Sequence, residues 1–432
     1  MTGRHGAWIR QKERKILRLM AGAVLLLAAV WTLGGCGGGG AGAAASGAAG
    51  SIADEIAGTA ADGTAGAASD ENTGIGDGIP ASAASGEAQA SPMPLLYADQ
   101  FSVDCYPDGS AVISVKESGR YLVLPEGGQV PDAFADAEDV TVIRRPLKNI
   151  YLAATSAMDL FAALDCVDQI TLSGTDADGW YVEAAKEAME AGRMVYSGKY
   201  NAPDYERILS MECDLAIEST MISHSPQVKE QLENLGIPVF VERSSYESHP
   251  LGRMEWIKVY GVLTGQEELA QKLFEEELSA LAPVLDQEPS GKTAAFFYIT
   301  SGGYVNVRKS GDYVAKMIEM AGGKYVPEGM GNDNALSTMN MQMEAFYAAA
   351  RDADYLIYNS TIDGELNTLE EFLEKNPLLA DFKAVKEGHV WCARKNMFQE
   401  TMSLGDMILD INRMLTKEEP ADEEMHFLRH LQ

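Results

Sequence analysis

The sequence lacks the short motifs by which two large classes of enzyme are recognised. It has no G-x-S-x-G nucleophile elbow, and no serine is singled out by a base at a fixed spacing. It also has no G-x-x-x-x-G-K-[ST] loop, which would cradle the phosphates of a nucleotide. We therefore expect a binding protein rather than an enzyme.

Cysteine is scarce, with five residues and no C-x-x-C pair. The wide separation of these residues gives little support for a zinc site or a redox motif. Four of them stand in or beside expected strands or helix ends, and we expect isolated buried thiols, although export would permit a disulfide. These four are Cys105, Cys166, Cys213 and Cys392.

Basic residues are few beside acidic ones: 34 Lys and Arg stand against 64 Asp and Glu, which gives a formal charge of -30 and a pI near 4.5. Nucleic acid and an anionic membrane surface both repel such a chain, so neither is expected as its main partner. With 432 residues, 46% of them hydrophobic, the chain can bury one large core or two ordinary ones. We expect two lobes.

The N-terminus has the pattern of an export signal. Basic residues between Arg4 and Arg18 precede an apolar run from Leu19 to Leu33, which is short beside the roughly 20 residues of a membrane span. The sequence LGGC that ends at Cys36 resembles the lipobox of bacterial lipoproteins, whose signal peptide is cut before a cysteine that carries lipid. This resemblance predicts lipid on Cys36 and a mature chain that begins there; an uncleaved anchor helix is the alternative.

Residues 37–91 consist almost entirely of Gly, Ala, Ser and Thr with scattered acids. Such a composition cannot form a core, so we expect a flexible tether. Treated as a coil, the tether would have a root-mean-square reach of about 40 Å. That reach would hold a folded body clear of a membrane surface.

From Asn149 onward, short apolar runs alternate with helical patterns. Strands of about five residues separated by helices indicate a mostly parallel sheet with helices on both faces. The predicted fold class is therefore α/β, with two such lobes. Strands are expected at 149–155, 169–173, 194–197, 214–219, 238–242, 293–300, 355–360 and 389–393, and helices at 156–164, 180–192, 203–211, 226–236, 312–322, 341–353 and 405–415.

The segment from Thr264 to Leu285 is predicted to be one long amphipathic helix that joins the lobes. Thr264 and Glu267 have the spacing of a capping box, and apolar residues recur every three or four positions after them. The helix would reach about 25 to 30 Å before Pro283 ends or kinks it. Ahead of the first lobe, the β-rich stretch 101–124 is broken by turn residues and predicts small antiparallel hairpins.

Together these patterns predict five segments. They are a signal peptide with lipobox at 1–36, a flexible tether at 37–91, an N-terminal α/β lobe at 92–252, a connecting helical segment at 253–285 and a C-terminal α/β lobe at 286–432.

The order of the motifs resembles the substrate-binding proteins of ABC importers, in the branch that handles iron-siderophores, haem and cobalamin. The resemblance covers roughly residues 149–415 and departs from the family pattern at Cys213, where proline is common. It implies two α/β lobes joined by one long helix, with a ligand between them. The matching features are the lipobox, TGQEE at 264–268, Glu206 ahead of Ile208 and Asp214-Leu215, GIPV at 236–239, Glu344, and AVKEGHV at 384–390.

Ligands of open α/β sheets bind outside the carboxyl ends of the strands, so the loops there hold the candidate site residues. Aromatic side chains offer flat surface, and arginines form charge-assisted bonds to anionic oxygens. This mixture predicts a medium-sized, partly anionic ligand. The candidates are Trp180, Tyr181, Met221, His224, Arg243, Tyr246 and His249 in the first lobe, and Tyr304, Arg308, Thr361, Arg394 and Phe398 in the second.

The resemblance implies an iron chelate, haem or cobalamin as ligand, without choosing among them. It also implies that Glu206 and Glu344, one on each lobe, dock on arginines of a permease; stabilisation of a helix start is the alternative for each. The expected partners are an ABC permease and its ATPase, with the protein a lipid-anchored monomer on the extracytoplasmic face. A tethered sensor for a membrane kinase and a bare-metal site with His224, His249 and Glu242 stay open as alternatives.

Overall fold

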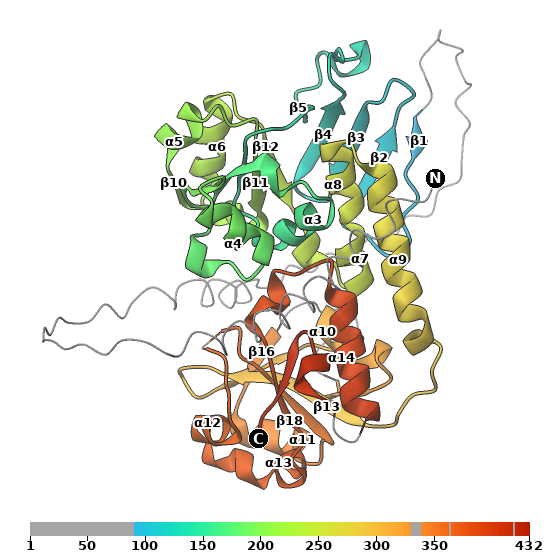
Figure 1. Cartoon of the computed structure of the whole chain (residues 1–432), viewed down its shortest axis with the longest axis vertical. Coiled ribbons are helices and arrows are strands. Elements are labelled where there is room, and N and C mark those ends of the chain that lie inside the picture. The colour runs from blue at the N-terminus through green and yellow to red at the C-terminus, as the bar shows by residue number, and fades with distance from the viewer. Residues whose placement is uncertain (1–89, 330–337, 363, 418–419) are drawn as a thin grey trace, which may run out of the picture. The chain divides into compact units, whose positions relative to one another are not determined.

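The computed structural model describes residues 90–329, 338–362, 364–417 and 420–432 (Figure 1). The expected signal peptide, Cys36 and nearly all of the expected tether lie outside these ranges. The described residues form two α/β lobes, as the sequence predicts. We call residues 90–256 lobe one and the part from β13 through β19 lobe two.

Lobe one is built on a parallel sheet with the strand order β12-β11-β6-β7-β8. The predicted alternation of strands and helices is confirmed in order and type. The strands are β6 (Ile150–Leu152), β7 (Ile170–Ser173), β8 (Val195–Tyr196), β11 (Leu215–Ser219) and β12 (Val239–Glu242), and the helices between them are α3 (Met158–Ala163), α4 (Glu183–Glu190), α5 (Tyr205–Ser210) and α6 (Pro226–Asn234).

A second sheet precedes this one, with the strand order β1-β2-β3-β4-β5. The predicted hairpins appear as antiparallel pairs of β2 with β3 and of β3 with β4, and β5 extends the sheet in parallel with β4. One face, with Val103, Ile113 and Tyr121, belongs to the large hydrophobic core that also includes residues of the connecting helices and of lobe two. The strands are β1 (Ser91–Pro92), β2 (Phe101–Cys105), β3 (Ala111–Val115), β4 (Gly119–Leu124) and β5 (Val140–Arg144).

Three helices connect the lobes: α7 (Pro250–Glu255), α8 (Ile257–Thr264) and α9 (Glu267–Leu285). The predicted capping box at Thr264 is wrong, because Thr264 ends α8 and its hydroxyl donates to the Tyr260 carbonyl at 2.7 Å. Gly265 then turns the chain with a φ of +73°, a left-handed conformation that glycine adopts freely. Glu267 instead accepts a bond of 2.7 Å from Arg145, and α9 continues through Pro283.

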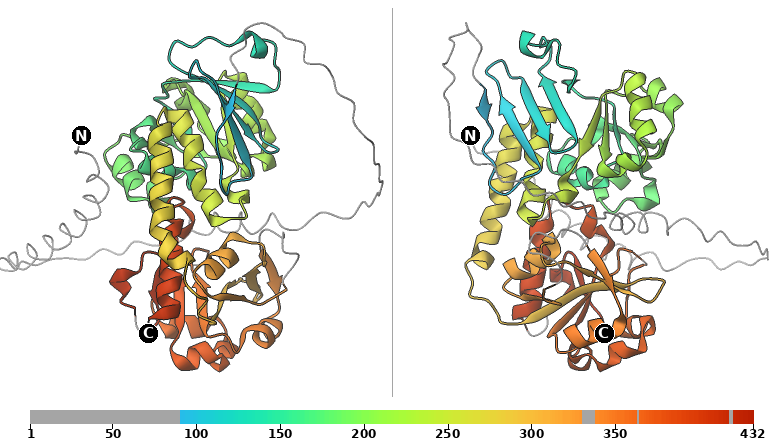
Figure 2. Two further views of the ribbon diagram at one scale, coloured as in Figure 1. Left: turned by 90° about the vertical axis from the view of Figure 1, so that its right-hand side faces the viewer. Right: turned by 180° about the vertical axis from the view of Figure 1, so that it is seen from behind.

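The helix α9 lies against both lobes (Figure 2). Its 19 residues span roughly 28 Å at 1.5 Å per residue. Near its start Ala270 packs so closely on Gly261 of α8 that a Cβ on that glycine would meet the alanine methyl at 2.7 Å. Near its end Leu281 would lie 3.5 Å from a Cβ on Gly405 in α14 (Leu404–Thr416). The prediction of one long connecting helix is confirmed.

The sheet of lobe two has the strand order β16-β14-β13-β17-β18-β19, and β15 also pairs with β13. Its centre is parallel, while β14, β16 and β19 add antiparallel neighbours. The strands are β13 (Thr293–Ile299), β14 (Val305–Arg308), β15 (Lys324–Val326), β16 (Thr338–Met341), β17 (Tyr355–Asn359), β18 (Val390–Ala393) and β19 (Leu428–His430). The helices are α10 (Tyr313–Met320), α11 (Met343–Ala350), α12 (Leu369–Lys375), α13 (Lys383–Glu387) and α14.

Candidate functional site

A small pocket lies where the two lobes meet, and we call this boundary the seam. Its cavity volume is about 20 Å³, which is room for one water-sized group. The lobe-one side comes from the segments that follow β6 and β12, and the lobe-two side comes mainly from the segment that follows β18. The lining residues are Ser156, Ser244 and Arg253 from lobe one and Tyr313, Met397, Phe398, Thr401 and Leu404 from lobe two.

Single hydrogen bonds cross the seam around this pocket. The Thr401 hydroxyl donates to the Ser156 carbonyl at 2.8 Å. The side-chain amide of Gln399 makes two bonds, accepting from the Tyr181 N–H at 2.7 Å and donating to the Gly179 carbonyl at 2.8 Å. Because each bond of this kind contributes only about 0.5 to 1.5 kcal/mol, these contacts can be exchanged for water.

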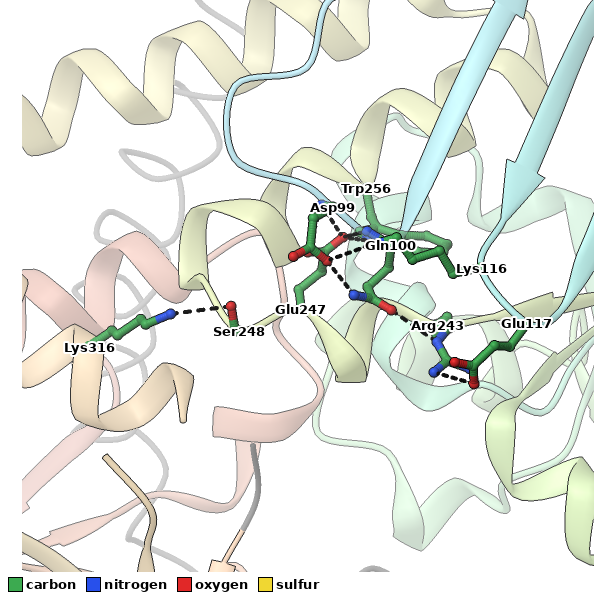
Figure 3. A network of polar contacts seen from close by, with 9 residues as sticks. All are labelled: Asp99, Gln100, Lys116, Glu117, Arg243, Glu247, Ser248, Trp256 and Lys316. Atoms are coloured by element: carbon green, nitrogen blue, oxygen red, sulfur yellow. Dashed lines mark hydrogen bonds and ion pairs between the residues drawn. The ribbon is translucent and has the colours of Figure 1, made fainter. Parts of the chain in front are cut away.

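Two charged groups also cross the seam. The Asp159 carboxylate accepts the backbone N–H of Met402 at 2.8 Å, just before the start of α14. Burial, together with the nearby Glu400 carboxylate, raises the pKa of Asp159 to about 7. The ammonium of Lys316 in α10 donates to the Ser248 hydroxyl at 3.2 Å (Figure 3). The seam therefore carries polar contacts on more than one side of the pocket.

Arg253 is the cation that lines the pocket, and sequence reasoning missed it. Its guanidinium carbon lies 3.5 Å from the ring centroid of Tyr313, across the seam. Its Nε donates to the Glu247 carbonyl at 3.2 Å, which fixes the side chain on lobe one. Arg253 stands within α7 rather than in a loop after a strand, so a search of the strand-end loops could not find it.

A buried acid lies beside the pocket at the end of β12. Glu242 is 1% exposed and accepts from the Ser244 N–H at 2.9 Å and from the Ser156 hydroxyl at 3.2 Å. Burial raises the pKa of Glu242, while these serine contacts lower it. The Tyr260 hydroxyl is buried without a partner in the described part of the chain, and Glu242 raises its pKa further beyond the effect of burial.

Two of the lobe-one candidates have structural roles in this arrangement. The Trp180 ring is fully buried, and its Nε1 donates to the Ser173 hydroxyl at 3.0 Å. The His249 ring stacks on Tyr97 with centroids 4.8 Å apart and caps α7 by accepting the Leu251 N–H at 3.2 Å. Burial lowers the pKa of His249, so its neutral form is favoured.

Arg243 is held by residues of the N-terminal sheet (Figure 3) and does not line the pocket. Its Nε donates to the Gln100 side chain at 3.0 Å, and its Nη2 lies 2.8 Å from the Glu117 carboxylate. Its guanidinium also stacks on Tyr246, 4.2 Å from the ring centroid. Of the remaining lobe-one candidates, Met221 is half-buried and His224 is exposed.

In lobe two, the structure brings two of the predicted residues together. Arg308 lies 5.4 Å from the ring centroid of Phe398, which lines the pocket, and pairs with Asp312 at 3.5 Å. Tyr304 is exposed in a turn. The Thr361 hydroxyl donates to Asn359 at 2.6 Å. Arg394 is half-buried, and its Nε has no acceptor within the described residues.

The remaining site predictions concern surface acids, thiols and metal ligands. Glu206 and Glu344 are both exposed in the first turns of α5 and α11. The four cysteines that the structure describes are free thiols, but only Cys166 and Cys392 are buried as expected, while Cys105 and Cys213 are half-buried. Within the described ranges, no group of three or more His, Cys, Asp or Glu side chains is placed to hold a metal ion.

None of the helices in the described part of the chain is long and apolar enough to cross a bilayer.

Asn396 and His426 were not singled out from the sequence, yet both contact Glu400 beside the seam. The sequence alone could not reveal these contacts, because His426 and Glu400 belong to separate segments that only the fold brings together.

Comparison with known proteins places this geometry in context. A family model described as periplasmic binding protein matches residues 152–396. An uncharacterized lipoprotein of Methanocaldococcus jannaschii is 23% identical over 321 residues, which cover 71% of this chain and 75% of that protein.

Two solved structures share the fold. The periplasmic haem-binding protein of Vibrio cholerae matches with a TM-score of 0.53 and 20% identity, covering 64% of this chain and 100% of its own. The petrobactin-binding protein of Bacillus subtilis matches with a TM-score of 0.51 and 15% identity, covering 64% and 94%. At such identities the likeness concerns the fold. The N-terminal sheet, β1 to β5, precedes the residues that the family model matches.

Proposed function

Because this chain belongs to the periplasmic binding protein family, we propose that it is an extracytoplasmic solute-binding lipoprotein that captures an iron chelate, haem or a corrinoid between its lobes. It then delivers the ligand to an ABC permease and its ATPase. The observation that carries the proposal is the seam, where aromatic, cationic and hydroxyl side chains of both lobes meet around one pocket.

The pocket must widen before it can take such a ligand. Sites for ligands of this size have volumes of about 300 to 1,000 Å³, far above the volume of this cavity. Single polar bonds cross the seam around the pocket, and a ligand that enters there must displace them. The ligand would then replace these bonds with its own contacts to both lobes.

The lipoprotein part of the proposal rests on the N-terminal sequence and on a relative. The sequence LGGC at Cys36 has the lipobox pattern, and the matched Methanocaldococcus jannaschii protein is itself named a lipoprotein. Lipid on Cys36 would be the covalent group that anchors the protein, and the Gly-rich stretch after it would be the tether. Glu206 and Glu344 would contact the permease, one from each lobe.

The test is a binding titration. Native mass spectrometry of protein purified from its host would first show whether a chelate, haem or a corrinoid is retained. Hemin, cyanocobalamin and a ferric catecholate are then titrated by tryptophan fluorescence quenching. We expect one of them to bind, and Phe398→Ala to weaken it by up to about tenfold through loss of ring stacking.

Tyr304→Ala serves as the matched control, because it removes an exposed aromatic ring of lobe two that does not line the pocket. It should bind like the wild type. If none of the three probes binds, or if Phe398→Ala binds as tightly as the control, the proposed site is wrong.

A further inference from the structure

Two lysines of this acidic chain, Lys186 and Lys395, lie at the seam. Most described lysines and arginines lie within 4.0 Å of a carboxylate, as expected for a formal charge of -30. Within the described residues, neither Lys186 nor Lys395 has such a partner. Both are half-buried, so solvent screens their charges only in part.

The two lysines come from different lobes and meet at one aromatic ring. Lys186 belongs to α4 of lobe one, and Lys395 follows β18 in lobe two. Each ammonium lies 5.8 Å from the ring centroid of Tyr181. The two ammonium groups are therefore no more than twice this distance apart, a span that a ligand with several charged oxygens can bridge.

Two hydrogen bonds of the Gln399 side chain hold Lys186, Lys395 and Tyr181 in this arrangement. This side chain binds the Tyr181 N–H and the Gly179 carbonyl at once, which ties the loop ahead of α4 to the segment that begins at Lys395. In Figure 1, α4 lies on the side of lobe one that faces lobe two. The lysines thus border the seam at the carboxyl ends of β7 and β18, where ligands of α/β sheets bind.

Like charges on one ring repel each other, and the ring compensates this repulsion only weakly. Each ammonium is attracted to the ring face, but this attraction leaves the net charge unchanged. Arg394, directly before Lys395, adds a third cation to the same segment, and its Nε has no acceptor among the described residues. An anion with several charged oxygens would neutralise the repulsion and form charge-assisted hydrogen bonds to both ammonium groups.

We propose that Lys186, Lys395 and Tyr181 form a subsite for a multiply charged oxyanion, which bridges the two lobes at the seam. The chemical class is a polycarboxylate or polyphosphate group, free or carried by a larger ligand. The inference rests on the proposed function in one respect: the subsite would hold the anionic part of the ligand that the cleft captures. A bound oxyanion would attract both ammonium groups, offset the repulsion between them and hold the lobes together.

The experiment uses citrate and inorganic pyrophosphate as probes, titrated calorimetrically at constant ionic strength. Lys186→Gln and Lys395→Gln each remove one ammonium, and each should weaken citrate binding at least about tenfold, the usual effect of losing a charged hydrogen bond. Lys292→Gln is the control, since it removes the same charge from an exposed lysine ahead of β13. That variant should bind like the wild type.

Pyrophosphate separates the possible sources of the anion. Tighter binding of citrate assigns the subsite to carboxylates, and tighter binding of pyrophosphate assigns it to phosphates. Absence of heat with both probes in the wild type, or equal affinity in all three variants, would overturn the subsite.

The outcome is separable from that of the hemin, corrinoid and catecholate titrations. Lysine-dependent citrate binding without any chelate binding would keep the subsite and remove the proposed function. Chelate binding, combined with anion affinities that do not change in the lysine variants, would keep the proposed function and overturn the subsite.

Discussion

The buried pair of Glu255 and Lys258 fastens the N-terminal sheet to the helices between the lobes, and its removal should be costly. Glu255 is 0% exposed and accepts backbone N–H groups of residues 96–98 at distances down to 2.7 Å. Lys258 lies 2.8 Å from this carboxylate, is 3% exposed and also donates to the Pro94 carbonyl at 2.9 Å. The segment that enters β2 is thereby bound to α7 and α8.

The perturbation is Glu255→Ala. It leaves the Lys258 charge buried without a counterion and removes the acceptor of three N–H groups. Breaking a buried pair from one side costs about 3 to 5 kcal/mol in the free energy of unfolding.

The assay is equilibrium unfolding in urea, with the double variant Glu255→Met/Lys258→Met in the same series. Removing both charges leaves no uncompensated ion, so the double variant should be more stable than Glu255→Ala. The surface pair of Lys272 and Glu276, whose side chains are 44% and 50% exposed, supplies the control, and Lys272→Ala should cost under about 1 kcal/mol. A loss below about 1 kcal/mol for Glu255→Ala, or a double variant that is no more stable, would refute the reasoning.

Two further predictions concern a buried acid and the surface acids. Burial raises the pKa of Glu218 well above its ordinary value, and its oxygens have no partner in the described part of the chain. The folded state therefore keeps a proton that the unfolded chain releases near pH 4.3, and stability falls as pH rises above that value toward the folded-state pKa. Glu218→Gln should reduce this fall in urea titrations at a series of pH values, because it removes the contribution of Glu218 while other buried acids such as Asp159 keep theirs; an unchanged pH dependence would contradict it. The double variant Glu206→Arg/Glu344→Arg should fold and bind ligand normally but lose most uptake in cells, because like charges across a docking interface cost several kcal/mol. Uptake at the wild-type level, with equal protein confirmed by blot, would remove the docking role.

The regular part of the fold could be predicted because its signal is local. Residues 293–300 form a β-rich apolar run, and β13 occupies nearly all of it. The strands β15 and β19 were missed because each has three residues, and their pairing partners lie elsewhere in the chain. Thr264 shows a different limit, since the spacing of a capping box does not reveal that the hydroxyl will bind the carbonyl four residues back.

The place of the candidate site could be predicted more securely than its members. Strand-end loops do meet at the seam, and Tyr181 and Phe398 lie there. Trp180 occupies such a loop too, but its ring is directed to Ser173 in the core, which only tertiary structure decides. Lys186 and Arg253 were missed because each stands within a helix rather than in a strand-end loop, and the sequence does not reveal that these helices lie at the seam.

The network around Glu247 indicates which contacts must change if the lobes part (Figure 3). Its carboxylate is 1% exposed and accepts the N–H groups of Asp99 and Gln100 and the indole N–H of Trp256, all within lobe one and its adjoining helix. The next residue, Ser248, instead contacts Lys316 of lobe two. Opening must break the Ser248 contact, whereas it can leave the bonds of Glu247 in place. The bonds of Glu247 therefore tie the N-terminal sheet to the lobe-one wall of the seam, so that the two would move together when the Ser248 contact breaks.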